Sequence, residues 1–239
     1  MIRLDKLLLD RQLVETRQKA SALVEEGGVQ VNGQIVQKPG KKFSEDAEIS
    51  LIKEPMPWVS RGALKLIGAL DAWNISTDSR TAMDVGSSTG GFTEVLLSRC
   101  VQRVIAVDSG TDQLVQKLRD DDRVEVFEKT NFRHFEPVAE IDLVVIDLSF
   151  ISLTLIWEPL CKHLAPGADI IALVKPQFEV GKENLTRNGI VKNDRARDRA
   201  LQNVIAEAKK LDYKHCATMP SPITGGDGNH EYLIHLTWQ

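Results

Sequence analysis

One segment constrains the fold of this chain more than any other, and it consists of Asp84-Val85-Gly86-Ser87-Ser88-Thr89-Gly90-Gly91-Phe92. It follows an apolar, strand-like run over residues 81–85 and precedes a helix expected over residues 92–99. Its glycines let the backbone turn tightly and approach a ligand without interference from Cβ atoms. In open parallel sheets, ligands bind beside such a loop, at the carboxyl ends of the strands. The segment therefore predicts a strand–loop–helix unit with a binding site.

Expected strands and helices alternate on both sides of this loop. The strands are expected at 81–85, 103–107, 124–127, 143–146, 170–174, 213–219 and 231–236, and the helices at 60–73, 92–99, 111–118, 153–163 and 194–211. Such alternation is typical of a mostly parallel sheet with helices on both faces. We therefore predict an α/β fold built on a Rossmann-like sheet.

The first fifty residues have a different pattern. Leucines at 4, 7 and 8 recur at helical spacing, and a second helix is expected over 16–26, ending at Gly27-Gly28. Asn32-Gly33 between apolar residues predicts a β-hairpin, with one more strand at 49–52. Pro55 and Pro57 resist both helix and central strand. We predict a small α+β domain over 1–52, a linker over 53–59 and a larger domain over 60–239.

The length, composition and net charge of the chain exclude few classes of protein. The 239 residues suit one medium and one small domain, and shares of 42% hydrophobic and 27% charged residues are those of a globular protein. A net charge of -4 does not suggest nucleic-acid binding, but local clusters of cations matter more than the total. The three cysteines are scattered without metal-ligand spacing, and no signal peptide or membrane span is evident. We therefore expect a cytoplasmic protein without a metal.

The glycine-rich loop does not match the common nucleotide motifs. Its spacing, Gly-x-x-x-Gly-Gly, differs from the nicotinamide fingerprint, and there is no Gly-Lys-Ser/Thr to cradle a triphosphate. The next strand ends at Asp108, where a carboxylate can accept hydrogen bonds from a ribose diol. Asn131, after the third strand, can meet an adenine edge or simply cap its own loop. A nucleoside-containing cofactor is favoured over a plain tight turn.

Four ionisable residues stand at predicted strand ends or helix starts, namely Lys65, Asp147, Lys175 and Glu231. A buried, isolated charge is costly, so two lysines and two carboxylates could neutralise one another in one site. Either lysine or Glu231 taken alone is more typical of an exposed charge at a strand end, whereas Asp147, between Ile146 and Leu148, fits that alternative least. Periodicity does not single out these four.

The chain resembles the TlyA family, bacterial proteins labelled both haemolysins and ribosomal-RNA 2′-O-methyltransferases, over essentially its whole length. Its second domain is similar to FtsJ/RrmJ-type ribose methyltransferases. The stretches that carry the resemblance are 59–62, 84–92, 144–153, 172–179 and 220–225. Ala63 stands where a glycine is often seen, and 55–59 keeps only the Trp-Val of a family linker that reads Arg-Ala-Trp-Val.

The resemblance implies a catalytic tetrad of Lys65, Asp147, Lys175 and Glu231 and a cytidine ribose in ribosomal RNA as target. It also implies S-adenosylmethionine as cofactor, held by residues of the loop and of two later strand ends. These residues are Asp84, Gly86, Ser87, Ser88, Thr89, Gly90, Gly91, Phe92, Asp108 and Asn131. A ribose hydroxyl is a poor nucleophile until a base removes its proton. Most of the acceleration would come from holding both reactants in line.

The first domain is similar to the RNA-binding module named after small-subunit ribosomal protein S-four. Its basic candidates for RNA contact are Arg3, Lys6, Arg11, Arg17, Lys19, Lys38, Lys41 and Lys42, balanced by eight acids before position 51. Binding would therefore depend on one basic face that recognises RNA shape through phosphates. In the second domain we add Arg61, and Lys182, Arg187 and Lys192 on a mobile lid expected over 177–193.

Two alternatives to the enzyme remain. One is a membrane-lytic protein, as the haemolysin label suggests, although the chain lacks a long amphipathic basic helix. The other is a non-catalytic RNA-binding factor in ribosome assembly. The expected partners of the enzyme are ribosomal RNA or assembled ribosomal subunits.

Overall fold

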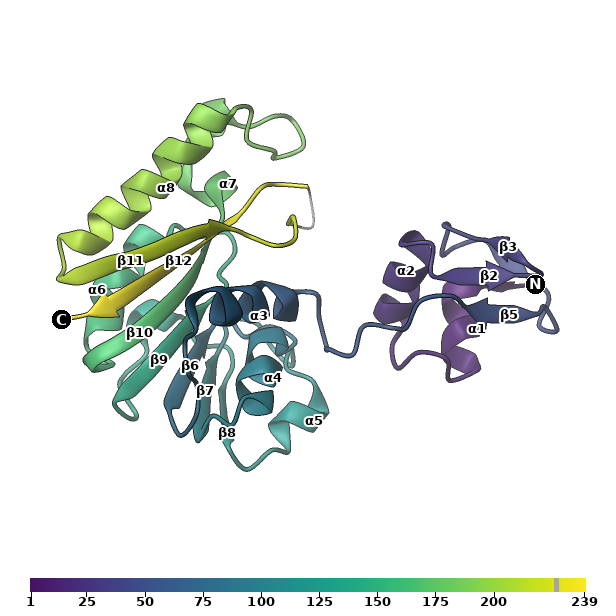
Figure 1. The fold of residues 1–239 in the computed structure, drawn as a ribbon, viewed down its shortest axis with the longest axis horizontal. Helices are drawn as coiled ribbons and strands as arrows, with labels where there is room; N and C mark the ends of the chain where they lie inside the picture. Colours follow the sequence, from purple (N-terminus) through teal and green to yellow (C-terminus); the bar gives the residue numbers. More distant parts are fainter. Residues whose placement is uncertain (226–227) are drawn as a thin grey trace. The chain divides into compact units, whose positions relative to one another are not determined.

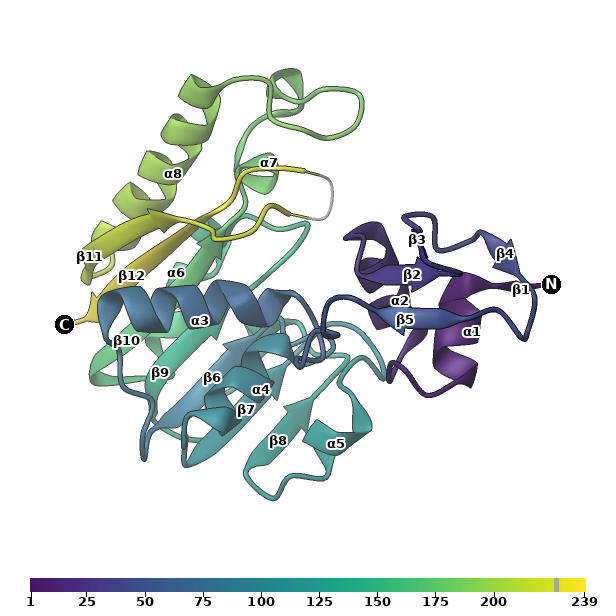
Figure 2. The ribbon, with the colours of Figure 1, turned by 45° about the vertical axis from the view of Figure 1, so that its right-hand side comes forward.

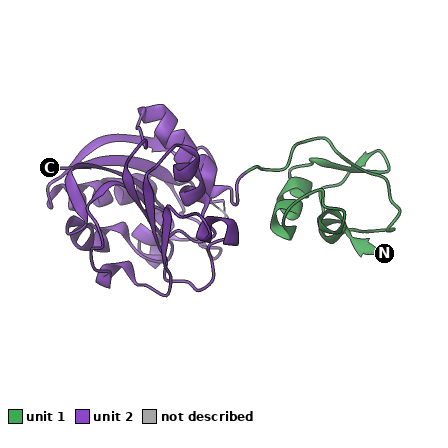
Figure 3. Ribbon diagram, turned by 90° about the horizontal axis from the view of Figure 1, so that it is seen from below, with its two compact units in different colours: residues 1–57 green, residues 58–239 purple. Residues whose placement is uncertain are grey.

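The computed structural model describes residues 1–225 and 228–239. They form two compact units, Met1–Pro57 and Trp58–Gln239, each with its own core (Figures 1 and 3). Residues 53–59, predicted as a linker, contain no helix or strand. Within the described ranges, no helix is both long and apolar enough to cross a membrane.

The first unit is a small α+β fold. Its elements are β1 (Ile2–Arg3), α1 (Leu4–Asp10), α2 (Arg17–Glu25), β2 (Val29–Val31), β3 (Gln34–Ile35), β4 (Lys42–Phe43) and β5 (Ile49–Leu51). The order β3-β2-β5 makes an antiparallel sheet, and β1 pairs with β4. Thr16 caps α2 by accepting a hydrogen bond from Lys19 N at 3.2 Å. The Asn32-Gly33 hairpin is present, with φ of +50° and +76° at the turn.

The second unit contains the predicted Rossmann-like sheet, in the order β11-β12-β10-β9-β6-β7-β8. Its strands are β6 (Thr81–Val85), β7 (Arg103–Val107), β8 (Val124–Phe127), β9 (Ile141–Ile146), β10 (Leu164–Val174), β11 (Tyr213–Pro220) and β12 (Tyr232–Trp238). Strands β10, β9, β6, β7 and β8 are parallel, whereas β12 is antiparallel to both β10 and β11. The carboxyl ends of the parallel strands therefore share one edge with the start of β12.

Helices cover both faces of this sheet (Figures 1 and 2). They are α3 (Gly62–Trp73), α4 (Gly91–Ser98), α5 (Gln116–Arg119), α6 (Trp157–Cys161), α7 (Pro176–Glu179) and α8 (Asp194–Lys209). Alternate strand residues point to opposite faces, so two cores result. Leu66 of α3 and Val95 of α4 pack with one set of strand residues, and Trp157 of α6 and Val204 of α8 pack with the other.

Two predicted helices are wrong in extent. The helix expected over 111–118 begins only at Gln116, because Asp112 has a left-handed backbone with φ of +50° and Val115 is extended; the carboxylate of Glu128 binds the backbone N–H groups of residues 112–114. The helix expected over 153–163 is divided into a 3₁₀ turn, Leu153–Leu155, and α6. Pro159 has no N–H to donate to the carbonyl of Leu155, so a continuous helix would lack that bond.

Candidate active site

Lys65 and Glu231 form a buried ion pair. Lys65, on the second turn of α3, donates from Nζ to Glu231 Oε2 at 2.6 Å, and the two residues are only 7% and 4% exposed. A Cβ atom added at Gly225 would lie 2.6 Å from Glu231 Oε1, so the backbone before β12 approaches this carboxylate closely. The two charges neutralise each other in a place where either one alone would be costly.

Asp147 and Lys175 form a second ion pair, which solvent reaches. They follow the neighbouring parallel strands β9 and β10, whose carboxyl ends meet at the same edge of the sheet. Lys175 Nζ lies 2.6 Å from Asp147 Oδ1, and it donates a hydrogen bond to Ser149 Oγ at 2.8 Å. The side chains of Lys175 and Asp147 are 11% and 22% exposed.

The structure brings the two pairs to one end of the domain. Val174 is paired with Tyr232 across β10 and β12, so Lys175 and Glu231 occupy adjacent strand ends. A Cβ atom at Gly62, in the first turn of α3, would lie 3.9 Å from Asp147 Oδ2. All four residues of the implied tetrad therefore border the carboxyl edge of the parallel strands.

The glycine-rich loop lies directly against Asp147. Gly86 and Gly90 have φ of +87° and +100°, which side-chain-bearing residues rarely adopt. A Cβ atom at Gly86 would come within 2.6 Å of the Asp147 carbonyl oxygen, and one at Gly90 within 2.2 Å of Leu118 Cδ1. Conformation therefore favours glycine at both positions, and at Gly86 the close approach of the Asp147 backbone requires it as well.

A cavity of about 210 Å³ opens beside this loop. It is lined by Val85, Gly86, Val107, Asp108, Ser109, Thr130, Asn131, Phe132, Leu148, Ser149, Ile151 and Ile156. Of the predicted cofactor residues, Gly86, Asp108 and Asn131 are in this lining. The other loop residues are not: Phe92, for example, is buried in the core beside α3. Ser149 connects the cavity to Lys175.

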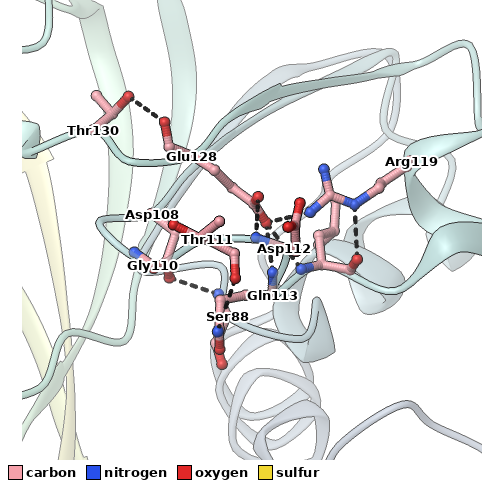
Figure 4. Close-up of polar contacts among 10 residues, drawn as sticks. Ser88, Asp108, Gly110, Thr111, Asp112, Gln113, Arg119, Glu128 and Thr130 are labelled. Carbon is pink, nitrogen blue, oxygen red and sulfur yellow. Dashed lines mark hydrogen bonds and ion pairs between the residues drawn. The ribbon is translucent and has the colours of Figure 1, made fainter.

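Asp108 and Asn131 keep binding capacity for a ligand. Asp108 accepts hydrogen bonds from the backbone N–H groups of Ser88 at 2.8 Å and Gly110 at 2.6 Å, and its carboxylate has further lone pairs (Figure 4). Asn131 Oδ1 accepts from Arg133 N at 3.1 Å and caps a 3₁₀ turn, Phe132–His134. The Asn131 side chain thus caps its loop and lines the cavity at once.

Asp84 lies behind the loop, fully buried. Its Oδ2 atom accepts a hydrogen bond from Thr93 Oγ1 at 2.7 Å, and burial raises the pKa of Asp84 to about 7. Within the described residues, Asp84 Oδ1 and Ser87 Oγ are buried without a hydrogen-bond partner. Unpartnered buried atoms of this kind are costly and are open to a polar ligand or water.

These observations fit S-adenosylmethionine, the cofactor that the resemblance implies. The carboxylate of Asp108 suits a ribose diol, and the apolar side chains of the cavity suit a purine. The residues present are therefore able to hold it, with Gly86, Asp108 and Asn131 in the lining.

An exposed aromatic residue next to the second ion pair was missed by sequence reasoning. Phe150 is 91% exposed with φ of +65°, and its ring centroid lies 5.1 Å from that of Phe178 on α7. Glu179 holds the same loop by accepting hydrogen bonds from Ser152 Oγ at 2.5 Å and Leu153 N at 2.8 Å. The available signal was a bulky apolar residue directly after the strand-end motif Asp147-Leu148-Ser149.

The predicted RNA-binding residues of the first unit are exposed, except for the half-buried Lys19. Arg3 and Arg17 both bind the buried carboxylate of Asp5, at 2.8 and 3.0 Å, and the hydrogen bonds of Arg3 are the largest cause that lowers the pKa of Asp5 to about 2. Lys19 pairs with Glu15 at 2.7 Å. The two arginines are thus held side by side by one acid.

The cationic segment predicted as a lid is ordered as a small hairpin. Leu185 and Val191 form a β-bridge, and the buried Asn229 accepts from Val191 N and donates to the Gly189 carbonyl, both at 3.1 Å. Lys182, Arg187 and Lys192 on this segment are exposed, as is Arg61 before α3. The mobility of the segment and its contact with RNA stay predictions.

Comparisons with known proteins agree along the whole chain. The model of the FtsJ-like methyltransferase family matches residues 58–238, and that of the S4 domain matches residues 2–49. The 16S/23S rRNA (cytidine-2′-O)-methyltransferase TlyA of Mycobacterium tuberculosis is 42% identical over 241 residues, which cover 99% of this chain and 90% of TlyA. The provisionally assigned rRNA methyltransferase YqxC of Bacillus subtilis is 43% identical over 240 residues, covering 99% and 85%.

A solved structure is similar as well. The protein from Streptococcus thermophilus, provisionally described as a haemolysin, is 44% identical and superimposes with a TM-score of 0.80 over 99% of this chain and 88% of its own. Relatives named for RNA methylation and for haemolysis are thus both similar to this chain over nearly its whole length. The chain therefore belongs to the TlyA family of FtsJ-like methyltransferases.

Proposed function

We propose that this protein transfers a methyl group from S-adenosylmethionine to a ribose 2′-hydroxyl in ribosomal RNA, with cytidine as the modified nucleoside. The observation that carries the proposal is the pairing of Lys65 with Glu231 and of Lys175 with Asp147 at one sheet edge, beside the cavity. The relatives named as rRNA cytidine-2′-O-methyltransferases support the choice of acceptor.

The cofactor supplies an electrophilic methyl group bound to a sulfonium. We assign the proton transfer to Lys175, because the carboxylate it pairs with is 22% exposed, against 2% for Glu231, and its Nζ is linked through Ser149 to the lining of the cavity. In the ion pair Lys175 carries a proton, which it would first release to solvent. The neutral Nζ would then receive the proton of the 2′-hydroxyl, and Asp147 would orient the resulting ammonium. The hydroxyl oxygen is then the nucleophile.

The buried pair has a supporting role in this mechanism. Lys65 and Glu231 join α3 to the start of β12. Together they would form a closely packed polar surface that faces the acceptor. Holding the acceptor oxygen in line with the methyl donor contributes most of the rate enhancement in a displacement of this type. We therefore treat Lys65 and Glu231 as residues that orient the ribose.

The exposed Phe150 gives the target base a surface to stack on. Single-stranded or flipped-out bases are commonly recognised by stacking on aromatic side chains. Phe150, supported by Phe178, stands beside Ser149 and so next to the proposed proton acceptor. The arginines on Asp5, together with Arg61, Lys182 and Arg187, would bind phosphates of the surrounding RNA. A ribosomal-RNA substrate agrees with the cytoplasmic location expected from the sequence.

The proposal is tested by tritium transfer from labelled S-adenosylmethionine to purified ribosomal subunits. Wild-type protein is expected to label the RNA, and Lys175→Ala protein is expected to label it at background level. Equal labelling by both proteins, or no labelling by either, contradicts the assignment. Digestion of the labelled subunits with nuclease or with protease shows whether RNA or protein carries the tritium.

A further inference from the structure

Glu128, directly after β8, gathers an unusual number of hydrogen bonds for one side chain (Figure 4). Its carboxylate accepts from the backbone N–H groups of Asp112 at 2.6 Å, Gln113 at 2.8 Å and Leu114 at 3.1 Å. The guanidinium of Arg119 also donates to it, and Arg119 Nε donates to the Leu114 carbonyl at 2.9 Å. One acid thereby fixes the whole connection between β7 and α5.

The contacts of Glu128 favour the charged form of its carboxylate. The hydrogen bond from Arg119 is the largest cause that lowers its pKa to about 2, and the three backbone N–H groups act in the same direction. Three consecutive N–H groups ahead of a short helix have no partner within that helix. Glu128 satisfies them in a segment that is not helical, because Asp112 has φ of +50° and Val115 is extended.

The connection held by Glu128 forms a support for the glycine-rich loop. A Cβ atom at Gly90 would lie 2.7 Å from Leu114 Cδ1 and 2.2 Å from Leu118 Cδ1, so these leucines pack directly on the loop. Val115 N also donates to the Thr89 carbonyl at 3.3 Å. A shift of residues 112–118 would therefore leave the loop without its packing partner.

The same connection is joined to Asp108. Asp108 accepts from Gly110 N and from Ser88 N, so its carboxylate links the connection to the glycine-rich loop. On the other side, Lys129 N donates to the Gly110 carbonyl at 2.8 Å, and Thr130 N donates to the Asp108 carbonyl at 2.9 Å. Asp108 and Thr130 both line the cavity, whereas Glu128 does not.

We propose that Glu128 is a positioning residue for the cofactor, which holds residues 108–118 so that Asp108 and the glycine-rich loop are arranged for binding before S-adenosylmethionine arrives. The inference rests on the proposed function and adds a residue that acts through Asp108 without lining the cavity. Ordering a binding loop in advance removes an entropic cost that the ligand would otherwise meet. Loss of Glu128 should therefore weaken cofactor binding and leave the chemical step at saturation unchanged.

The test compares Glu128→Ala and Glu128→Gln with a matched control, Glu125→Ala. Glu125 lies on β8, the strand that Glu128 follows, and pairs with Arg103 at 2.6 Å on an exposed surface. Binding of S-adenosylhomocysteine to each full-length protein is measured by titration calorimetry. We expect the Kd to rise about tenfold or more for Glu128→Ala, less for Glu128→Gln, which keeps one acceptor oxygen, and less than about twofold for Glu125→Ala.

Kinetics separate positioning from a general loss of structure. With ribosomal subunits as acceptor, KM for S-adenosylmethionine should rise in Glu128→Ala while kcat stays within about twofold of wild type. A Kd equal to that of wild type, or a kcat that falls as far as the affinity, overturns the inference. If Glu128→Ala does not fold, the Kd of Glu128→Gln decides: an unchanged value overturns the inference.

The binding measurement needs no RNA, so it tests the role of Glu128 independently of the proposed methyl acceptor. Wild-type protein that binds S-adenosylhomocysteine but labels no RNA contradicts the proposed acceptor only. Wild-type and Glu128→Ala proteins of equal affinity contradict the role of Glu128 only.

Discussion

Lys65 Nζ lies 2.6 Å from Glu231 Oε2, although 166 residues separate them along the chain. This contact closes the domain, because it joins its first helix to the residue just before its last strand inside a buried site. Removal of one partner from a buried ion pair leaves an uncompensated charge, which costs about 3–5 kcal/mol.

Variants of the Lys65–Glu231 contact should separate effects on the free energy of unfolding from effects on methyl transfer. Lys65→Met and Glu231→Leu are each expected to lower the free energy of unfolding by about that amount, whereas the double variant recovers much of the loss. None of the three variants should methylate RNA, because the polar surface that orients the ribose is lost. Urea unfolding and tritium transfer measure the two properties. A double variant as unstable as the sum of the single ones, or one that is active, contradicts this account.

Lys175 should behave differently, because its pair with Asp147 is partly exposed. Lys175→Ala leaves a carboxylate that water can solvate, so the melting temperature should change little. Methyl transfer should nevertheless fall by about 10²–10⁴-fold, as expected when a proton acceptor is lost. Single-turnover transfer and calorimetric unfolding check this, and Lys162→Ala, a change in an exposed pair with Glu136, is the matched control. A large loss of stability would show that Lys175 is mainly structural.

Phe150 combines an exposed ring with a left-handed backbone, at φ of +65°. Phe150→Gly is expected to keep or raise the melting temperature, because glycine adopts this conformation without strain. KM for ribosomal RNA should rise about 5–100-fold, which corresponds to one base–aromatic stack. KM for S-adenosylmethionine should stay constant. Phe150→Tyr retains the ring and should bind RNA normally, and equal KM values for Gly and Tyr variants would exclude stacking.

Asp84 should make stability depend on pH. Burial raises its folded-state pKa to about 7, whereas an exposed aspartate titrates at about 4. The stabilisation from the bound proton is therefore complete below about pH 4 and is lost as the pH rises through about 7. Asp84→Asn cannot ionise, so its melting temperature relative to wild type should increase between pH 5 and pH 8 in protein without cofactor. A difference that stays constant over this range contradicts the assignment of burial as the cause.

The fold could be predicted from sequence because each strand carries its own apolar signal. The runs ending at Val85, Val107 and Ile146 are buried parallel strands, and their order in the chain already indicates helices on both faces. Asp147 and Lys175 could be placed at one edge for the same reason: each directly follows such a run.

The remaining features depend on contacts between distant residues. The helix expected at 111–118 is shortened by the left-handed backbone of Asp112 and the extended Val115, and no local pattern encodes the bonds that Glu128 makes to residues 112–114. Lys65 meets Glu231 only through the complete fold. Phe150 itself has a left-handed backbone, and sequence periodicity does not predict this conformation or the exposed ring. Local sequence patterns therefore predict the helices and strands, whereas the arrangement of the site depends on how these pack in the complete fold.

The central claim is most directly tested by mapping 2′-O-methylation in ribosomal RNA from a deletion strain. The strain is complemented with wild-type protein, with Lys175→Ala protein or with an empty vector, and protection from alkaline cleavage locates each methylated ribose. We predict a protected cytidine with wild-type protein that is absent in the other two strains. Identical protection patterns in all three strains, or a wild-type-dependent methyl group on a base, would contradict the assignment of this protein as a ribose methyltransferase.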